Sequence, residues 1–322
     1  MKRSKTPAFV ALLLLLGLPM LVAPWYGWGA RPGKPVVIVV AKGASLTAVA
    51  TVLEKAGLID APRQFRILAR ILGTNAPVQA GSYRLVPGAG WGHYLEMLQH
   101  GRVLRQFITI PEGLPAVLVA ERLRAERQLS GVVAVPAEGS VLPETYDFQI
   151  GEPRAKLLSR MQAAMTTTLA ALWKRRAATT VAKTPADALI LASIVEKETG
   201  KPSERRMVAG VYSNRLRQGM KLDADPTVIY PISQGRPLGR RIRRSELAAD
   251  NGYNTYLKPG LPRGPIANPG RASIAAVLDP AVTDALYFVA DGSGGHVFAS
   301  SLAEHNANVA RWFAIRRKRG EL

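Results

Sequence analysis

The chain has 322 residues, a formal net charge of +20 and no cysteine. The missing cysteines exclude disulfides, thiol catalysis and cysteine-based metal sites. The length is sufficient for two domains with hydrophobic cores.

The amino terminus carries Lys2, Arg3 and Lys5 and continues into an uncharged, apolar stretch at residues 8–28. About 20 apolar residues can span a bilayer as a helix. Trp25, Tyr26 and Trp28 close this stretch, as is typical of a membrane interface. By the positive-inside rule the sequence predicts a cytoplasmic tail (1–7), a single transmembrane helix (8–28) and a linker (29–35) that leads outside. Processing of a signal peptide after Ala23 is the alternative.

The basic excess is concentrated at residues 174–176, 240–244 and 316–319. Such an excess indicates an anionic partner. The expected export and the lack of any recognised nucleic-acid module argue against nucleic acid. Anionic lipid or an acidic polymer remains, although each basic run can also be a solvated face, and we interpret 316–319 as a solvated tail. The four histidines show no paired ligand spacing, so we expect no metal and no cofactor.

After the linker, residues 36–40 predict a strand, and Ser45 predicts the start of a helix that Gly57 ends. A second helix follows at 63–72, then a strand at 81–86 and a third helix at 91–100. This order of strand, helix, helix and strand predicts a small α+β module at 36–107.

The remaining chain, 108–322, predicts a larger mixed α+β domain. It is preceded by a strand at 103–110 and starts with an amphipathic helix at 115–128. Residues 130–140 predict a loop, and 156–178 a basic helix rich in alanine.

The next helix, 186–199, has well-marked ends. Thr184 can cap it, Pro185 suits its first position and Asp187 falls three residues after the cap. Gly200 and Pro202 end it.

One carboxylate of this helix lies where an apolar residue is expected. At roughly 100° per residue, Glu198 falls between Leu191 and Ile194 on the apolar side, whereas Glu196 falls with Ser193 on the polar side. A carboxyl group on a buried face has a raised pKa, which suits a general acid near neutral pH. Alternatively, Glu198 reaches solvent or pairs with Arg205 or Arg215.

Another helix is predicted at 204–218. The stretch 223–284 is rich in Pro, Gly, Asn and Tyr and predicts an ordered, irregular segment of the functional kind. A strand at 285–290 and a second at 296–298 then predict a hairpin through Gly292, Gly294 and Gly295.

Several segments together resemble the signature blocks of the MltG/YceG family of endolytic murein transglycosylases. They keep one order along the chain: LPETYDF (142–148), ASIVEKET (192–199), SER (203–205), VYSNRLRQGMKLDADPTVIY (211–230), YNTY (253–256), GLPRGPIANPG (260–270) and LYFVADGSGGHVFASSLAEHN (286–306). The module at 36–107 also resembles the LysM-like modules that bind cell-wall glycan. The resemblance therefore assigns 108–322 as a YceG-like catalytic domain.

The resemblance implies lytic cleavage of the β-1,4 bond between N-acetylmuramic acid and N-acetylglucosamine in nascent peptidoglycan, with a 1,6-anhydro product end that limits strand elongation. It also implies that the second glutamate of the IVEKE block, Glu198, is catalytic, the residue that the helical geometry selects independently. Glu196 is the structural alternate. One carboxyl group can suffice because the C6 hydroxyl of the sugar replaces the water that ordinary glycosidases activate.

Further polar and aromatic residues of the blocks are candidates for binding sugar hydroxyls and pyranose faces, with turn formation or core satisfaction as the alternative for each. They are Glu144, Tyr146, Asn214, Asp225, Thr227, Tyr253, Asn254 and Tyr256.

The expected partners are peptidoglycan glycan strands, the membrane and, by resemblance, peptidoglycan synthases, with no nucleic acid. The expected location is the inner (cytoplasmic) membrane, with the catalytic domain on the periplasmic side. A non-catalytic, membrane-anchored peptidoglycan-binding scaffold is the alternative function.

Overall fold

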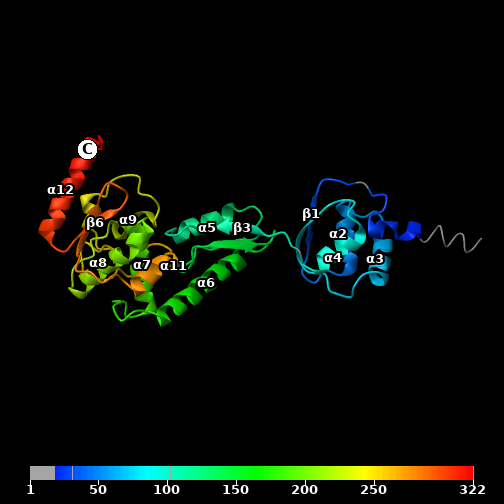
Figure 1. The fold of residues 1–322 in the computed structure, drawn as a ribbon, viewed down its shortest axis with the longest axis horizontal. Coiled ribbons are helices and arrows are strands. Elements are labelled where there is room, and N and C mark those ends of the chain that lie inside the picture. The colour runs from blue at the N-terminus through cyan, green and yellow to red at the C-terminus, as the bar shows by residue number, and fades with distance from the viewer. Residues whose placement is uncertain (1–18, 31, 102, 322) are drawn as a thin grey trace, which may run out of the picture. The chain divides into compact units, whose positions relative to one another are not determined.

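The structure is a computed structural model that describes residues 19–30, 32–101 and 103–321 (Figure 1). The chain forms two compact units. The first comprises Met1–Phe107 with Asp147–Gly151, and the second comprises Ile108–Tyr146 with Glu152–Leu322. The predicted limits of 36–107 and 108–322 did not anticipate the return of Asp147–Gly151 to the first unit.

Residues 8–18 of the predicted membrane span lie outside the described residues, and 19–28 are described. Within the described ranges, no helix combines the length and the apolar character needed to cross a bilayer.

The first unit contains β1 (Val36–Val40), α2 (Leu46–Lys55), α3 (Pro62–Ile71), β2 (Gly81–Leu85) and α4 (Trp91–Gln99). The predicted order of strand, helix, helix and strand is confirmed. The two strands pair antiparallel, so that Val36 lies opposite Leu85 and Val40 lies opposite Gly81. The Ser45 side chain caps α2 by accepting a hydrogen bond from the Ala48 amide at 3.2 Å. The helices bury their apolar faces in one core, which includes Val49, Leu53, Phe65, Tyr83 and Leu98.

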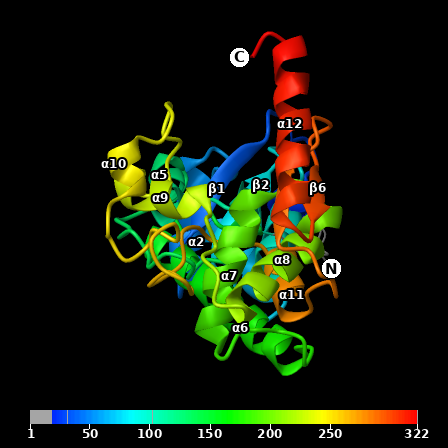
Figure 2. The same ribbon diagram turned by 90° about the vertical axis from the view of Figure 1, so that its left-hand side faces the viewer.

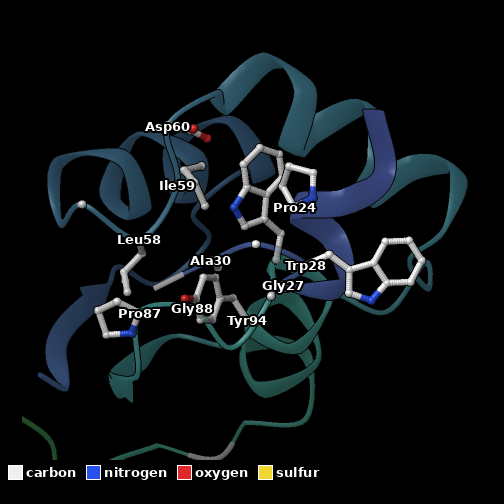
Figure 3. A pocket seen from close by; sticks show the side chains of 14 residues that line it. Pro24, Gly27, Trp28, Ala30, Leu58, Ile59, Asp60, Pro87, Gly88 and Tyr94 are labelled. Carbon is white, nitrogen blue, oxygen red and sulfur yellow. The ribbon is translucent and has the colours of Figure 1, made fainter. Parts of the chain in front are cut away.

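The aromatic residues before the linker divide between core and surface. Trp25 is only 8% exposed and packs into the core of the first unit, so its predicted place in a membrane belt is wrong. Tyr26 and Trp28 are exposed, and their rings stack at 5.2 Å. A cavity of about 450 Å³ lies between the Trp28 segment, Leu58 to Asp60, and the turn at Pro87 and Gly88 (Figure 3).

The second unit includes α5 (Ala116–Ala125) and α6 (Arg154–Lys174). Strand β3 (Gln106–Thr109) is shorter than predicted and pairs with β4 (Thr145–Phe148). The division between the two units falls within these strands. Strand β4, at the end of the LPETYDF block, was not predicted from the sequence.

Three helices form the centre of the second unit: α7 (Pro185–Glu198), α8 (Arg205–Arg217) and α11 (Arg271–Leu278). They pack on one another, and α6 covers α7 and α11 (Figure 1). A 3₁₀ turn, η1 (Pro202–Glu204), connects α7 to α8. The shared core includes Leu191, Ile194, Val208, Ile274 and Val277.

The predicted irregular stretch 223–284 is wrong as a whole, because it contains α9 (Asp225–Ser233), α10 (Arg244–Leu247) and α11. These helices have four to nine residues, too few to show a helical repeat. In addition, α9 contains Pro231 and α11 is apolar on most sides, which obscures the pattern further.

The predicted hairpin is confirmed as β5 (Tyr287–Ala290) and β6 (His296–Ala299), which pair antiparallel. Helix α12 (Leu302–Lys318) packs on both strands and lies alongside β6 (Figure 2). The basic run 316–319 is therefore not a free tail. It forms the end of α12, and Arg319 donates a hydrogen bond to the Gly292 carbonyl at 2.6 Å.

Candidate active site

Helix α7 places the site, and its start is built as the sequence predicts. The Thr184 hydroxyl accepts a hydrogen bond from the Asp187 amide at 3.1 Å, and the Asp187 carboxylate accepts one from the Thr184 amide at 3.0 Å. This reciprocal pair satisfies two amides that a helix start leaves free.

Two residues of the predicted polar side of α7, Ser193 and Glu196, are buried as well, because α6, α8, α9 and α11 pack around the helix, whereas Lys197 is exposed. Ser193 is fully buried and its hydroxyl accepts a hydrogen bond from the Ile266 amide at 3.0 Å. The Glu196 side chain is only 5% exposed. Their predicted place on the polar side does not expose these two residues, and a single helix gives no sign of how many neighbours cover it.

Glu196 is fully occupied by structural contacts. Its carboxylate pairs with Arg205 at 3.3 Å and accepts a hydrogen bond from the Gly270 amide at 2.9 Å. Arg205 also pairs with Glu112 at 2.7 Å. These contacts join α7 to the start of α11 and to the turn before α5, so they give Glu196 a structural role.

Glu198 is the last residue of α7, and its carboxyl group is in a different environment. Its Oε1 atom is buried without a hydrogen-bond partner. Burial raises the pKa of Glu198 to about 7, and the nearby negative charge of Asp225 acts in the same direction. A hydrogen bond with Tyr212 and the positive charge of Arg215 oppose this shift. The carboxyl group is therefore partly protonated near neutral pH, as a general acid requires.

The alternative of an ion pair to Glu198 does not hold. Arg205 is bound to Glu112 and Glu196. Arg215 pairs with Asp223 at 3.1 Å and also donates to the carbonyls of Leu222 and Leu286. It acts on Glu198 through its charge and not through a salt bridge.

Tyr212 lies on α8 and is almost completely buried against Phe288, with the two rings at 87°. Burial and the charge of Glu198 raise the pKa of the Tyr212 phenol well above its usual range. The phenol stays protonated and can donate to the Glu198 carboxyl group.

Asp225 and Tyr256 complete this cluster. Asp225 is the first residue of α9, and its carboxylate accepts a hydrogen bond from the Tyr256 hydroxyl at 2.6 Å. The charges of Asp225 and Glu198 both act on the Tyr256 phenol, whose pKa is raised mainly by burial. Of the residues expected to bind substrate, these two lie beside Glu198.

Three other candidates are engaged in structural hydrogen bonds. The Asn214 amide donates to the Thr283 and Ala285 carbonyls. The Thr227 hydroxyl binds the Ala224 carbonyl and the Thr255 hydroxyl, which secures the start of α9. The Asn254 amide donates to the Leu247 and Ala249 carbonyls. Their predicted contacts with sugar stay predictions that this geometry does not support.

The remaining candidates lie at two other places. Glu144 and Tyr146 line a cavity of about 500 Å³ beside α6, and the Tyr146 hydroxyl donates to the Leu142 carbonyl at 2.7 Å. Tyr253 packs on Tyr230 at 4.9 Å, under the guanidinium of Arg263. The structure therefore does not gather all the predicted residues into one cluster.

A second buried carboxyl group, Glu138, was missed because it lies in a segment assigned only as a loop. It accepts hydrogen bonds from the Ala116 amide at 2.9 Å and from Tyr230, and burial raises its pKa to about 7. Glu138 is the single charged residue of the apolar stretch 131–143. A lone carboxylate among apolar residues was the sequence signal that could have predicted its burial. Tyr212 was also missed, because the sequence does not show that α8 presents it to the end of α7.

The arrangement defines a class of site: proton transfer by one buried carboxyl group with a raised pKa, flanked by a protonated phenol and a second carboxylate. Residues 38–311 match the YceG-like family, and the chain belongs to it.

Two curated relatives and one solved structure extend the comparison. The endolytic murein transglycosylase of Bacillus subtilis is 28% identical over 310 residues, which cover 86% of this chain and 84% of the relative. The Streptococcus pneumoniae protein of the same name is 29% identical over 330 residues, which cover 87% of this chain and 59% of the relative. A crystal structure of a YceG-like protein from Listeria monocytogenes aligns with a TM-score of 0.52 and 27% identity, over 85% of this chain and 99% of that one.

The raised pKa of Glu198 predicts how this residue affects stability. Because the folded-state pKa lies above the unfolded value, its contribution is present below about pH 4.5 and is lost as the pH rises through about 7. A neutral glutamine avoids this loss, so Glu198→Gln should raise the free energy of unfolding at pH 8 by up to about 3 kcal/mol. At pH 4 the two proteins should differ little. Urea unfolding at both pH values measures this.

Glu196→Gln is the matched control, two residues away on the same helix. It breaks a buried ion pair and should lower the free energy of unfolding at pH 8 by about 2 kcal/mol. If Glu198→Gln were also less stable than the natural chain at pH 8, Glu198 would be held as a carboxylate and could not be the acid.

Proposed function

We propose that this protein is an endolytic lytic transglycosylase of peptidoglycan, which cleaves the MurNAc–GlcNAc β-1,4 bond inside nascent glycan strands and leaves a 1,6-anhydro-MurNAc end. The observation that carries the proposal is the buried, partly protonated Glu198 at the end of α7. The family membership and the names of the relatives support the same chemistry.

In the first step, protonated Glu198 donates its proton to the glycosidic oxygen as the bond to C1 breaks. In the second step, the resulting carboxylate takes the proton from the C6 hydroxyl of the same sugar, which attacks C1 and closes the anhydro ring. Glu198 is thus protonated again at the end, and no water has to be activated. Because Glu198 acts first as the general acid and then as the general base, it must give up a proton and accept one in turn. This requires a pKa close to the working pH.

The surroundings of Glu198 support this cycle. The buried Tyr212 phenol stabilises the carboxylate form and the Asp225 charge stabilises the protonated form. Burial is the main cause of the raised pKa of Glu198, and these two neighbours act on that pKa in opposite directions. Tyr256, bound to Asp225, is a candidate for contact with the sugar, because its phenol lies beside the acid.

The first unit is proposed to be a LysM-like module that holds glycan. The chain is proposed to be anchored in the inner membrane with both units outside the cytoplasm.

One described helix supports a position near anionic lipid. Helix α3 exposes Arg63 and Arg70 together with Ile67 and Ile71. Gln64 joins α3 to the end of the apolar stretch by donating to the Leu21 carbonyl at 2.6 Å. Tethering near the membrane would bring the enzyme to nascent strands and to peptidoglycan synthases.

The central prediction concerns the product. Glu198→Gln should lower the rate of anhydro-product formation from purified glycan by about a thousandfold, because the proton donor is lost. Mass spectrometry of the digest measures it, since an anhydro end is one water lighter than a reducing end. Glu196→Gln, assayed below its own unfolding temperature, should still give the anhydro product. Reducing ends would instead show hydrolysis, and the absence of any product from the natural chain would favour a binding scaffold.

The pH dependence should respond to the two neighbours in opposite directions. Activity falls as the pH rises through the pKa of Glu198, about 7, because the acid must start protonated. Tyr212→Phe removes an interaction that lowers this pKa and should move the alkaline limb to higher pH. Asp225→Asn removes one that raises it and should move the limb to lower pH. The measurement is kcat/KM against pH, and shifts of the same sign in both variants would contradict the assignment of the limb to Glu198.

The topology can be tested with single cysteines, because the chain has none of its own. In spheroplasts, a membrane-impermeant maleimide should label Thr51→Cys, an exposed position of the first unit, at once. It should label Ser4→Cys only after lysis. Equal labelling of both before lysis would contradict a single span with the amino terminus inside.

A further inference from the structure

A cavity of about 510 Å³ in the second unit is lined by the chain neighbours of two residues of the Glu198 cluster. Lys197, which precedes Glu198, and Pro226, which follows Asp225, both line it. Its other walls are the turn before α5, the first turn of that helix, and α9 with the turn after it. The volume is in the range of small-ligand sites, and the mechanism proposed above makes no use of it.

Two glycines bring the walls close together. Gly235 has φ +80°, and a Cβ atom there would lie 2.7 Å from Cβ of Pro115. Gly113 has φ +71°, and a Cβ atom there would lie 3.3 Å from Cγ of Glu196 and 3.6 Å from Cδ of Lys197. Both positions favour glycine through their backbone conformation, and the Lys197 stem runs along the Gly113 backbone.

The charges around the cavity leave one cation available. Glu112 pairs with Arg205 at 2.7 Å, and Arg236 pairs with Glu121. Among the charged residues that line the cavity, Lys197 is the one with no ion pair in the described part of the chain, and it is exposed. Glu138 is hydrogen-bonded to Tyr230 and is influenced by the charge of Lys197, but burial raises its pKa to about 7, so it does not carry a full negative charge near neutral pH.

The rest of the lining is mainly aliphatic, with Leu114, Pro115, Leu118, Ile229 and Ile266, and Tyr230 is its single aromatic residue. A sugar site needs more polar partners and stacking faces than these walls offer. A short peptide with methyl-sized side chains and free carboxylates fits aliphatic walls beside one ammonium group.

The chemistry of the substrate places such a peptide at this point. The cleaved bond starts at C1 of the muramoyl residue, and the acidic stem peptide is attached through O3 of the same ring. A peptide on the sugar being cleaved must therefore leave the ring close to the acid, and the cavity is lined by the residue before that acid.

We propose that this cavity binds the acidic stem peptide of the muramoyl residue at the scissile bond, with the Lys197 ammonium paired to a stem carboxylate. The inference rests on the proposed function and adds a preference: peptide-bearing glycan is cleaved more efficiently than bare glycan.

The test compares two substrates from one source, glycan strands with their stem peptides and the same strands stripped by an amidase. The measured quantity is the ratio of kcat/KM for the two, with the full chain in detergent. Lys197→Met should lower this ratio about tenfold, the effect expected for a charge-assisted contact. Lys197→Arg should restore most of it. Lys174→Met removes another exposed lysine, on α6, and should leave the ratio unchanged.

A second variant probes the space and not the charge. Leu118→Trp, on the cavity wall, should also lower the ratio, because the larger ring occupies the peptide volume. An equal loss on both substrates in Lys197→Met would overturn the inference, since Lys197 would then act only through Glu198. A ratio near one for the natural chain would overturn it as well.

Binding separates this inference from the proposed function. In the Glu198→Gln background, fluorescence titration with a disaccharide peptide and with the same disaccharide without its peptide should show tighter binding of the first. Lys197→Met should abolish that difference. If the natural chain released no anhydro product, the proposed function would fail while the titration still decided on the peptide cavity, and equal affinities would reject the cavity.

Discussion

The active site depends on the removal of one carboxyl group from water at the end of a helix. Glu198 would have an ordinary pKa if it faced solvent, and it would then be ionised and useless as an acid at neutral pH. Burial raises the pKa, and the opposing influences of Asp225 on one side and of Tyr212 and Arg215 on the other hold it near 7. Each of these neighbours comes from α8 or α9, so the packing of those helices on α7 sets the acidity of the group.

The same burial explains why α7 is so heavily bound to its surroundings. Ser193 accepts from the Ile266 backbone, and Glu196 joins Arg205 to the Gly270 backbone. A helix that ends in an unsatisfied carboxyl oxygen is destabilised at that end, and these contacts hold it in place. The buried carboxyl group of Glu198 therefore lowers the stability of this end of α7, and the same burial makes the group able to transfer protons near neutral pH.

The local sequence was sufficient to predict the start of α7, the βααβ order of the first unit and the hairpin of β5 and β6. Each has a strong local signal: the Thr184 and Asp187 capping pair, the β-branched run at 36–40, and the glycines at 292–295. It also singled out Glu198, because one carboxylate breaks an apolar helical pattern. The helices α9 and α11 could not be predicted, since they are short and their burial comes from neighbours distant in sequence. For the same reason the roles of Tyr212, Arg215 and Glu138 became visible only in three dimensions, and Asn214 and Asn254 turned out to be engaged by backbone carbonyls.

Arg205 links two segments of the chain through ion pairs. Its guanidinium is the common partner of Glu112, from the turn before α5, and of Glu196, from α7. Loss of this arginine would leave two acidic side chains without their shared cation. Loss of either acid would remove one of the two ion pairs that connect the turn before α5 with α7. Mutational drift at any one of these positions is therefore constrained by the other two, so the trio should be inherited, or replaced, as a set.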